Sequence, residues 1–138
     1  MLYSSKMSNT KIVKEIIGII HDLEYVSDNT VITNITFSIL STYDAISDWT
    51  VHHLKEKYSL GKDYLLNIYY SKTKGGKINT DKQHKVSIVF KLLEDRYDTH
   101  TIQQILNTDY NIYMSENSVN KIKSEVVRLL ASLLFHNS

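Results

Sequence analysis

Apolar residues recur at spacings of three and four along most of the chain, which is the pattern of α-helices that bury one face. Residues 31–43 are rich in β-branched side chains and fit a strand almost as well as a helix. We expect a helix there, with a strand as the alternative. The helices predicted elsewhere cover residues 10–25, 47–58, 63–75, 80–95, 99–107 and 115–135.

The length of 138 residues suits one compact domain, and the chain contains no proline and only four glycines. Long helices are therefore rarely forced to end, which favours an all-α, compact multi-helix domain with a long C-terminal helix. No repeat or linker divides the chain. The predicted organisation is a flexible start at 1–9, N-terminal helices at 10–45, a first helix-turn-helix candidate at 46–76, a linker helix at 80–95, a second candidate at 99–125, and a helix end at 126–138.

The composition argues against an enzyme. The chain has no cysteine, and no glycine-rich phosphate loop or nucleophile elbow is present. His52 and His53 are adjacent, so on a helix they point about 100° apart and do not form a metal site. We therefore expect no catalytic residue, no metal and no cofactor.

No segment is long and apolar enough for a membrane span. The apolar stretch 126–135 is about ten residues long and contains Arg128. Residues 16–20 are too short and too close to charged residues for a signal peptide. These observations predict a soluble, cytoplasmic protein.

The first helix-turn-helix candidate spans residues 49–70. Such a unit needs apolar anchors on both helices, which lock them at a steep angle and leave the second helix free to enter a DNA groove. The predicted anchors are Leu54, Tyr58, Leu60, Leu65 and Ile68, with the turn near Gly61. The predicted DNA contacts are Lys62, Asn67, Tyr70, Ser71, Lys72 and Lys74.

The second candidate spans residues 101–124. Ile102 and Ile105 anchor its first helix, and Val119 and Ile122 anchor its second. Asparagine and lysine are suitable partners for base edges and phosphates. The predicted cap and contacts of this unit are Ser115, Asn117, Asn120, Lys121 and Lys123.

Two such units joined by a helix resemble the DNA-binding domain of AraC/XylS-type transcription regulators, over residues 36–125. The second unit alone is also similar to a LuxR-type module. The residues that carry the resemblance are Leu54, Tyr64, Leu65 and Tyr69 in the first unit, Lys85, Leu92 and Leu93 in the linker helix, and Ile102 and Ile105 in the second unit. The resemblance implies sequence-specific binding of duplex DNA by a transcription regulator.

Charge and apolar patterning leave two functions open. Residues 62–91 hold seven lysines and two aspartates, although the net charge of the chain is only +1. A regulator that binds paired DNA half-sites would be a homodimer, and the stripe Val126, Leu129, Leu130 and Leu133 is the predicted seam. Packing against the core is the alternative for that stripe. The alternative function is a small bacterial, phage or virus protein that binds a host or partner protein through an apolar surface.

Overall fold

All regular secondary structure is helical in the part of the chain that the computed structural model describes, residues 8–23, 42–70 and 80–135. No strand occurs within these residues, which confirms the predicted all-α class. The elements are α1 (Asn9–Leu23), the 3₁₀ turn η2 (Asp44–Ile46), α3 (Val51–Tyr64), the π-helical segment η3 (Leu65–Tyr69), α4 (Thr80–Glu94), α5 (Thr99–Tyr110) and α6 (Glu116–Leu134).

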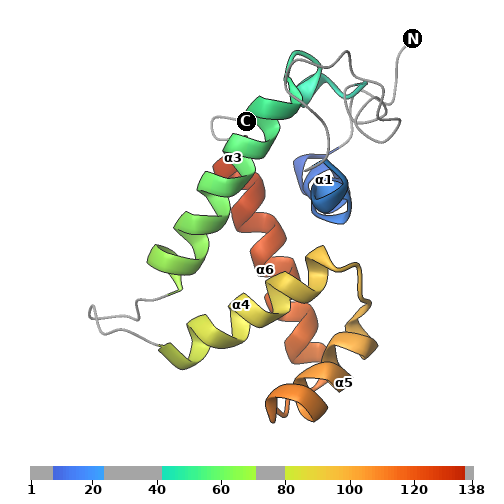
Figure 1. Cartoon of the computed structure of the whole chain (residues 1–138), viewed down its shortest axis with the longest axis vertical. Coiled ribbons are helices and arrows are strands. Elements are labelled where there is room, and N and C mark those ends of the chain that lie inside the picture. The colour runs from blue at the N-terminus through green and yellow to red at the C-terminus, as the bar shows by residue number, and fades with distance from the viewer. Residues whose placement is uncertain (1–7, 24–41, 71–79, 136–138) are drawn as a thin grey trace.

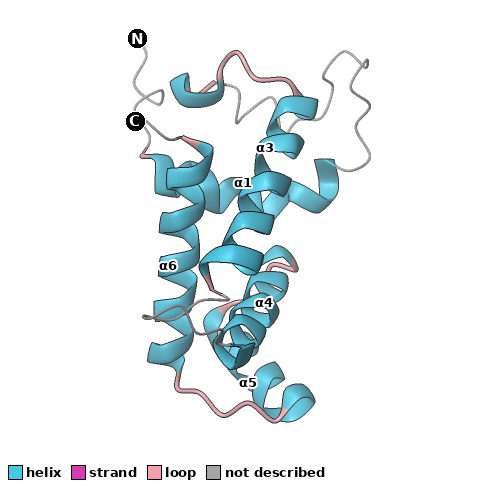
Figure 2. Cartoon of the chain, turned by 90° about the vertical axis from the view of Figure 1, so that its left-hand side faces the viewer, coloured by secondary structure: helices cyan, strands magenta, loops and turns pink. Residues whose placement is uncertain are grey.

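Helix α6 is the central element of the fold. It packs against α1, α3, α4 and α5, and it runs along the length of the molecule (Figures 1 and 2). The α5–α6 loop lies at one end of the molecule, away from the part of α6 that contacts α3 (Figure 2). This arrangement divides the packing of α6 into two stretches with different neighbours.

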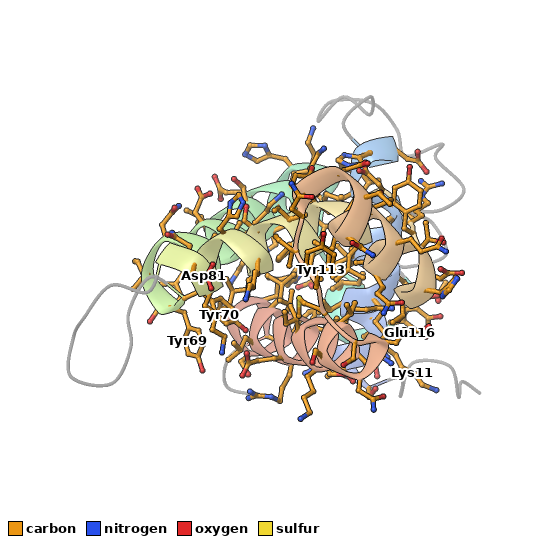
Figure 3. The ribbon with its side chains drawn as sticks, turned by 90° about the horizontal axis from the view of Figure 1, so that it is seen from below. Lys11, Tyr69, Tyr70, Asp81, Tyr113 and Glu116 are labelled. Carbon is orange, nitrogen blue, oxygen red and sulfur yellow. The ribbon has the colours of Figure 1, made fainter. Side chains whose placement is uncertain are left out.

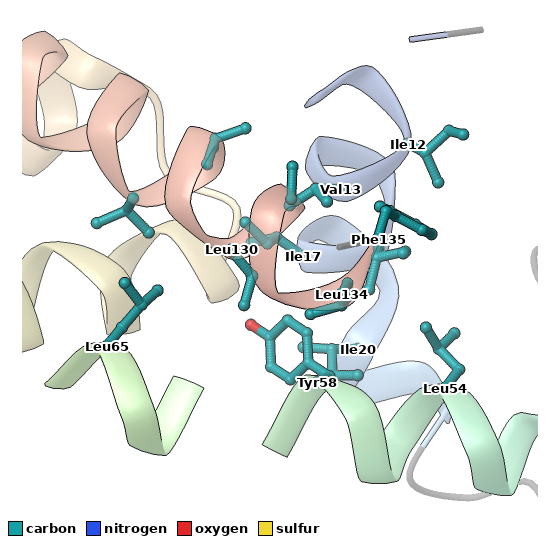
Figure 4. Packing of buried hydrophobic residues seen from close by; sticks show 14 of the residues in the cluster. Ile12, Val13, Ile17, Ile20, Leu54, Tyr58, Leu65, Leu130, Leu134 and Phe135 are labelled. Atoms are coloured by element: carbon teal, nitrogen blue, oxygen red, sulfur yellow. The ribbon is translucent and has the colours of Figure 1, made fainter. Parts of the chain in front are cut away.

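The main core is formed by α1, α3, α6 and residues of η2, η3 and α4. Ile12, Ile16 and Leu23 of α1 are fully buried, as are Leu54 of α3 and Leu130 of α6. Figure 4 shows side chains from α1, α3 and the C-terminal half of α6 meeting in this cluster. Burial of one full apolar side chain stabilises the fold by roughly 1.5–3 kcal/mol, so this cluster holds most of the molecule together.

A second, smaller core joins α4, α5 and the start of α6. Its buried members are Ile88, Val89, Leu92, Ile102, Leu106 and Val119. Residues at helical spacing supply each contribution, as the sequence pattern predicts. This core fixes α5 against the first turns of α6 independently of α3.

Several predicted boundaries are close to the observed ones, and others are corrected. Helix α5 continues to Tyr110, three residues beyond the predicted end, because Asn111 adopts the left-handed conformation (φ 57°) that ends it. The helix predicted from residue 47 begins later, at Val51, because the hydroxyl of Thr50 accepts a hydrogen bond from His53 N at 3.0 Å and caps α3. The predictions for residues 1–7 and for most of 31–43 lie outside the described residues.

The largest correction concerns Gly61, where the sequence predicts a turn between two helices. Helix α3 passes through Gly61 without interruption and continues into η3. A Cβ at this position would lie 2.9 Å from Leu130 Cδ1 and 3.1 Å from Leu134 Cδ1. The glycine therefore allows α3 and α6 to approach closely, and the first helix-turn-helix does not exist.

Candidate nucleic-acid interface

Helices α5 and α6 form a helix–loop–helix whose boundaries are each fixed by a specific residue. Asp98 accepts a hydrogen bond from Thr101 N at 2.8 Å and caps α5. Ser115 accepts one from Ser118 N at 3.1 Å and caps α6. These caps satisfy backbone N–H groups that have no partner within the helix. The second predicted unit therefore folds as two helices joined by a short loop.

The first half of α6 presents one polar side and one apolar side. Val119 and Val126 are fully buried, and Ile122 is partly buried between the two cores. The opposite side exposes Asn117, Asn120, Lys121 and Ser124, which follow at helical spacing. We call these four residues the α6 polar face. Lys121 has no ion-pair partner within the described residues, so its charge is available to a ligand.

A hydrogen-bonded chain ties the α6 polar face to the start of α5. Lys123 Nζ donates to Thr99 Oγ1 at 2.8 Å, and that hydroxyl donates to Asn120 Oδ1 at 2.6 Å. The chain orients Asn120 through its oxygen and leaves the amide nitrogen of its side chain to donate to a ligand. Lys123, predicted as a DNA contact, is partly buried and acts first as a strut between the two helices.

Acidic groups lie close to this surface. Glu116 Oε2 is 3.0 Å from His100 Nδ1, so the two side chains form a pair that spans the starts of α5 and α6. The hydrogen bonds from Thr101 lower the pKa of the Asp98 carboxyl below its ordinary value, because they favour its charged form. The carboxylates of Glu116 and Asp98 therefore border the α6 polar face. They repel phosphate, so a lysine attracts phosphate most where it points away from them.

The described residues of the first candidate are arranged differently from the prediction. Leu54, Tyr58 and Leu65 are buried as anchors should be. Leu60 is 65% exposed and Ile68 is 46% exposed, so these two predicted anchors point outwards. Together with Tyr64, which is 45% exposed, they form a row at four-residue spacing on the outer side of α3 and η3. We call Leu60, Tyr64 and Ile68 the α3 apolar stripe.

Lys62, predicted as a DNA contact, forms an internal ion pair. Its Nζ lies 2.8 Å from Glu94 Oε1 and 5.0 Å from the centroid of the Phe90 ring. Tyr58 donates to the other oxygen of the same carboxylate at 2.6 Å. Only 5% of Glu94 is exposed, so its charge needs both partners. Burial, reinforced by the adjacent carboxylate, raises the pKa of the Tyr58 hydroxyl and keeps it protonated.

Tyr70 is also corrected as a DNA contact. It is 3% exposed, and its hydroxyl donates to Glu125 Oε1 at 2.6 Å. Burial and this hydrogen bond raise the pKa of the Tyr70 hydroxyl. In Figure 3 Tyr69 and Tyr70 lie on the opposite side of the molecule from Glu116 at the start of α6. Tyr70 is therefore an internal contact to the middle of α6 and does not itself present a surface to DNA.

Of the remaining predicted contacts of the first unit, one lies within the described residues and three lie outside them. Asn67 is exposed and lines a shallow groove beside α4 with Gln83 and His84. Ser71, Lys72 and Lys74 lie outside the described residues. The basic run of the sequence therefore adds no described contact to the α6 polar face.

The predicted dimer seam lies within the monomer. Val126 and Leu130 are fully buried against α1 and α3. Leu129 and Leu133 are partly buried and pack on the same cluster. Packing against the core, the alternative for this stripe, is what the structure shows. A second chain could reach Val126 and Leu130 only if α1 or α3 moved away, whereas Leu129 and Leu133 keep part of their surface exposed.

Comparisons with known proteins add no family to this picture. No protein-family model, curated protein or solved structure matches the chain. Within the described residues no helix is long and apolar enough to cross a membrane, and no three His, Cys, Asp or Glu side chains gather as metal ligands. The function must therefore be argued from the surfaces themselves.

Proposed function

We propose that this chain is a DNA-binding transcription regulator that contacts duplex DNA through the α5–α6 unit, with α6 as the recognition helix. The observation that carries the proposal is the α6 polar face, where Asn117, Asn120, Lys121 and Ser124 are all exposed beside a capped helix start. In helix-turn-helix proteins the N-terminal residues of the second helix contact base edges. The local packing that such a unit needs is supplied by the second core.

The side chains on the α6 polar face suit different kinds of DNA contact. Asparagine can form two hydrogen bonds with an adenine edge, so Asn117 suits such a contact, while Asn120, whose oxygen accepts from Thr99, can donate to a base through its amide nitrogen. Lys121 suits a phosphate or a guanine edge, because its ammonium group has no internal partner among the described residues. The helix start also directs its partial positive charge toward a bound phosphate.

The charge of the chain predicts modest affinity for nonspecific DNA. The net charge is +1, and Glu116 and Asp98 border the polar face. Each phosphate contact contributes about 0.9 to the slope of log affinity against log salt. We expect a shallow slope, and therefore specificity that depends on the asparagines more than on phosphate attraction.

The test is fluorescence anisotropy with random-sequence duplex DNA at several salt concentrations, followed by selection of the preferred sequence from the same pool. Lys121→Glu should weaken binding to all sequences and lower the salt slope by about 1. Asn120→Ala should relax sequence preference at one position, at a cost of about 1–3 kcal/mol for the preferred site.

Lys57→Glu is the matched control, because Lys57 lies on α3 and the charge change is the same. It should leave DNA binding nearly unchanged. Lys72→Glu and Lys74→Glu test the basic run separately. Absence of binding even at low salt, or equal losses for Lys57→Glu and Lys121→Glu, would contradict the proposed role of α6.

A second candidate function is favoured by the α3 apolar stripe. Leu60, Tyr64 and Ile68 expose 65%, 45% and 46% of their surfaces in one row, and Tyr69 beside them exposes 44%. Aligned exposed side chains of this size are typical of a protein-binding surface. Under this alternative the chain is a helical interaction protein, and a second copy is the simplest partner because such a row can pair with itself.

Analytical ultracentrifugation separates the outcomes for this stripe. A concentration-dependent dimer that is lost in Leu60→Glu with Ile68→Glu would assign the stripe to self-association. A photo-cross-linking residue at position 64 would mark a different protein partner in cells. A monomer without adducts would count against this second function and leave the DNA proposal unaffected.

A further inference from the structure

A groove of about 410 Å³ lies between α1, the end of α4 and the first half of α6. These three segments come from distant parts of the sequence and meet on one side of the molecule (Figure 1). Ile17, Leu93 and Val127 line the groove with apolar surface. The volume falls within the range of small-molecule sites, and the apolar lining suits the body of an organic ligand.

The charged lining of the groove is entirely positive. Lys14, Arg96 and Lys123 contribute to it, and no carboxylate does. Arg96 pairs with Asp22 at 2.7 Å, outside the lining. Lys123 donates to the neutral hydroxyl of Thr99, and Lys14 has no ion-pair partner within the described residues. Neither lysine forms an ion pair with a carboxylate within the described residues, although the charge of Lys123 acts on Asp98 from a longer range.

Arg96 adopts a backbone conformation that arginine disfavours. Its φ is 70°, at the end of α4, where glycine usually closes a helix. The closing hydrogen bonds are present, from Tyr97 N to Leu92 O at 3.2 Å and from Arg96 N to Leu93 O at 2.9 Å. A glycine would form them without strain. The arginine therefore costs stability at a position where its side chain lines the groove.

Gly18 is a second residue at this groove that lowers the stability of its helix. It lies in the middle of α1, where glycine weakens a helix relative to alanine. A Cβ built at Gly18 would meet no atom within 4 Å, in contrast to Gly61. Close packing therefore does not account for this glycine. What its small size does is leave the groove open beside Lys14.

We propose that this groove binds a small organic anion that has both an apolar body and a phosphate or carboxylate group. The body lies on Ile17 and Val127, and the anionic group pairs with Lys14 and Lys123. The apolar lining favours this class over a bare inorganic ion. A DNA backbone phosphate shares the anionic chemistry, and the measurements below separate it from a free ligand.

The first test is calorimetric titration of the full chain with 1-naphthyl phosphate, in the absence of DNA. The same titration is repeated with inorganic phosphate and with neutral 1-naphthol. Binding of 1-naphthyl phosphate at least about tenfold tighter than either comparison compound is expected, because only it engages both the cations and the apolar lining. Equal binding of inorganic phosphate, or no binding of the naphthyl compound, would overturn the proposal.

Substitutions at the groove provide matched controls. Gly18→Leu should block the groove and abolish binding, whereas Gly18→Ala should retain it, because a methyl group at this position meets open space. Both changes favour the helix, and thermal melting checks that each variant is folded. Lys14→Ala should weaken binding roughly tenfold or more, through the loss of a charge-assisted contact. Lys121→Ala, outside the groove, should not. Unchanged binding in Gly18→Leu would place the ligand elsewhere and overturn the proposal.

The consequence for DNA rests on the proposed function of α6. Asn120 and Ser124 belong to both the α6 polar face and the groove lining, so an occupied groove should change DNA affinity several-fold. Calorimetry without DNA and anisotropy without ligand are read separately. Ligand binding without DNA binding would contradict the proposed regulator function and support the groove as a ligand site. In a third outcome, naphthyl phosphate and duplex DNA compete for one site, and Gly18→Leu does not change this competition. That result would mean that the anion occupies the site of a DNA backbone phosphate and not the groove.

Discussion

Residues 49–70 and 99–125 have similar apolar patterns, and yet they fold differently. The first region is a continuous helix that passes through Gly61 and ends in a π-helical segment. The second region is two helices separated by a loop. The difference lies in the stop and start signals. Asn111 and Ser115 end one helix and begin the next, whereas the first region has a lone glycine.

This comparison shows that a glycine within a helical pattern has two physical uses. It can end a helix by adopting a left-handed backbone, or it can remove a side chain so that another helix approaches closely. Gly61 has the second use, since Leu130 and Leu134 occupy the space of its missing side chain. The consequence is that Leu60 and Ile68 face outwards, where a helix-turn-helix would bury them.

The largest expected effect is at Lys62, which the sequence places on a DNA surface and the structure places beside a buried carboxylate. Lys62→Met should lower the free energy of unfolding by about 3 kcal/mol, because it leaves the Glu94 charge without its cation. Chemical denaturation measures the change. Adding Glu94→Gln should recover much of the loss. A stable Lys62→Met variant that fails to bind DNA would instead support the original interpretation.

The next effect tests how Gly61 is used. Gly61→Val should lower the free energy of unfolding by about 2 kcal/mol, since added methyl groups would collide with Leu130 and Leu134. The same substitution at Gly18, where the space is open, should change stability by less than about 0.5 kcal/mol. Urea titration of both variants gives the comparison. Equal effects at the two glycines would argue against the close approach of α3 and α6.

A smaller effect tests the boundary that makes the second region a true helix–loop–helix. Ser115→Ala removes the cap of α6 and should cost about 1 kcal/mol of unfolding free energy. Ser132→Ala, on an exposed position late in the same helix, is the control and should have almost no effect. If both substitutions cost the same, the start of α6 would not depend on Ser115.

The smallest effect distinguishes an anchor from an exposed residue. Leu60→Ala should change the free energy of unfolding by less than about 0.5 kcal/mol, because Leu60 is 65% exposed. Leu54→Ala, on the buried side of the same helix, should cost about 2–5 kcal/mol. Thermal or urea unfolding measures both. A large loss at Leu60 would mean that it packs against something in solution, such as a second copy.

The sequence by itself determined the class of the fold and most of the helices. Periodic apolar positions are a local property, so α1, α4, α5 and α6 could be located to within a few residues. The N-cap at Ser115 was also predicted, because capping depends on a hydroxyl and its neighbouring backbone. Of the predicted contact surface, Asn117, Asn120 and Lys121 are exposed as expected.

Only the tertiary structure decided which apolar and charged side chains are exposed and free to contact a ligand or partner. The helix pattern shows that Val126 and Leu130 lie on one face, but α1 and α3 cover that face, and no local signal reveals it. Lys62 became the partner of the buried Glu94 carboxylate, 32 residues away in the sequence. The groove of Lys14, Arg96 and Lys123 is likewise assembled from three distant segments. Burial and ion pairing depend on which helices meet, and that is set by packing over the whole chain.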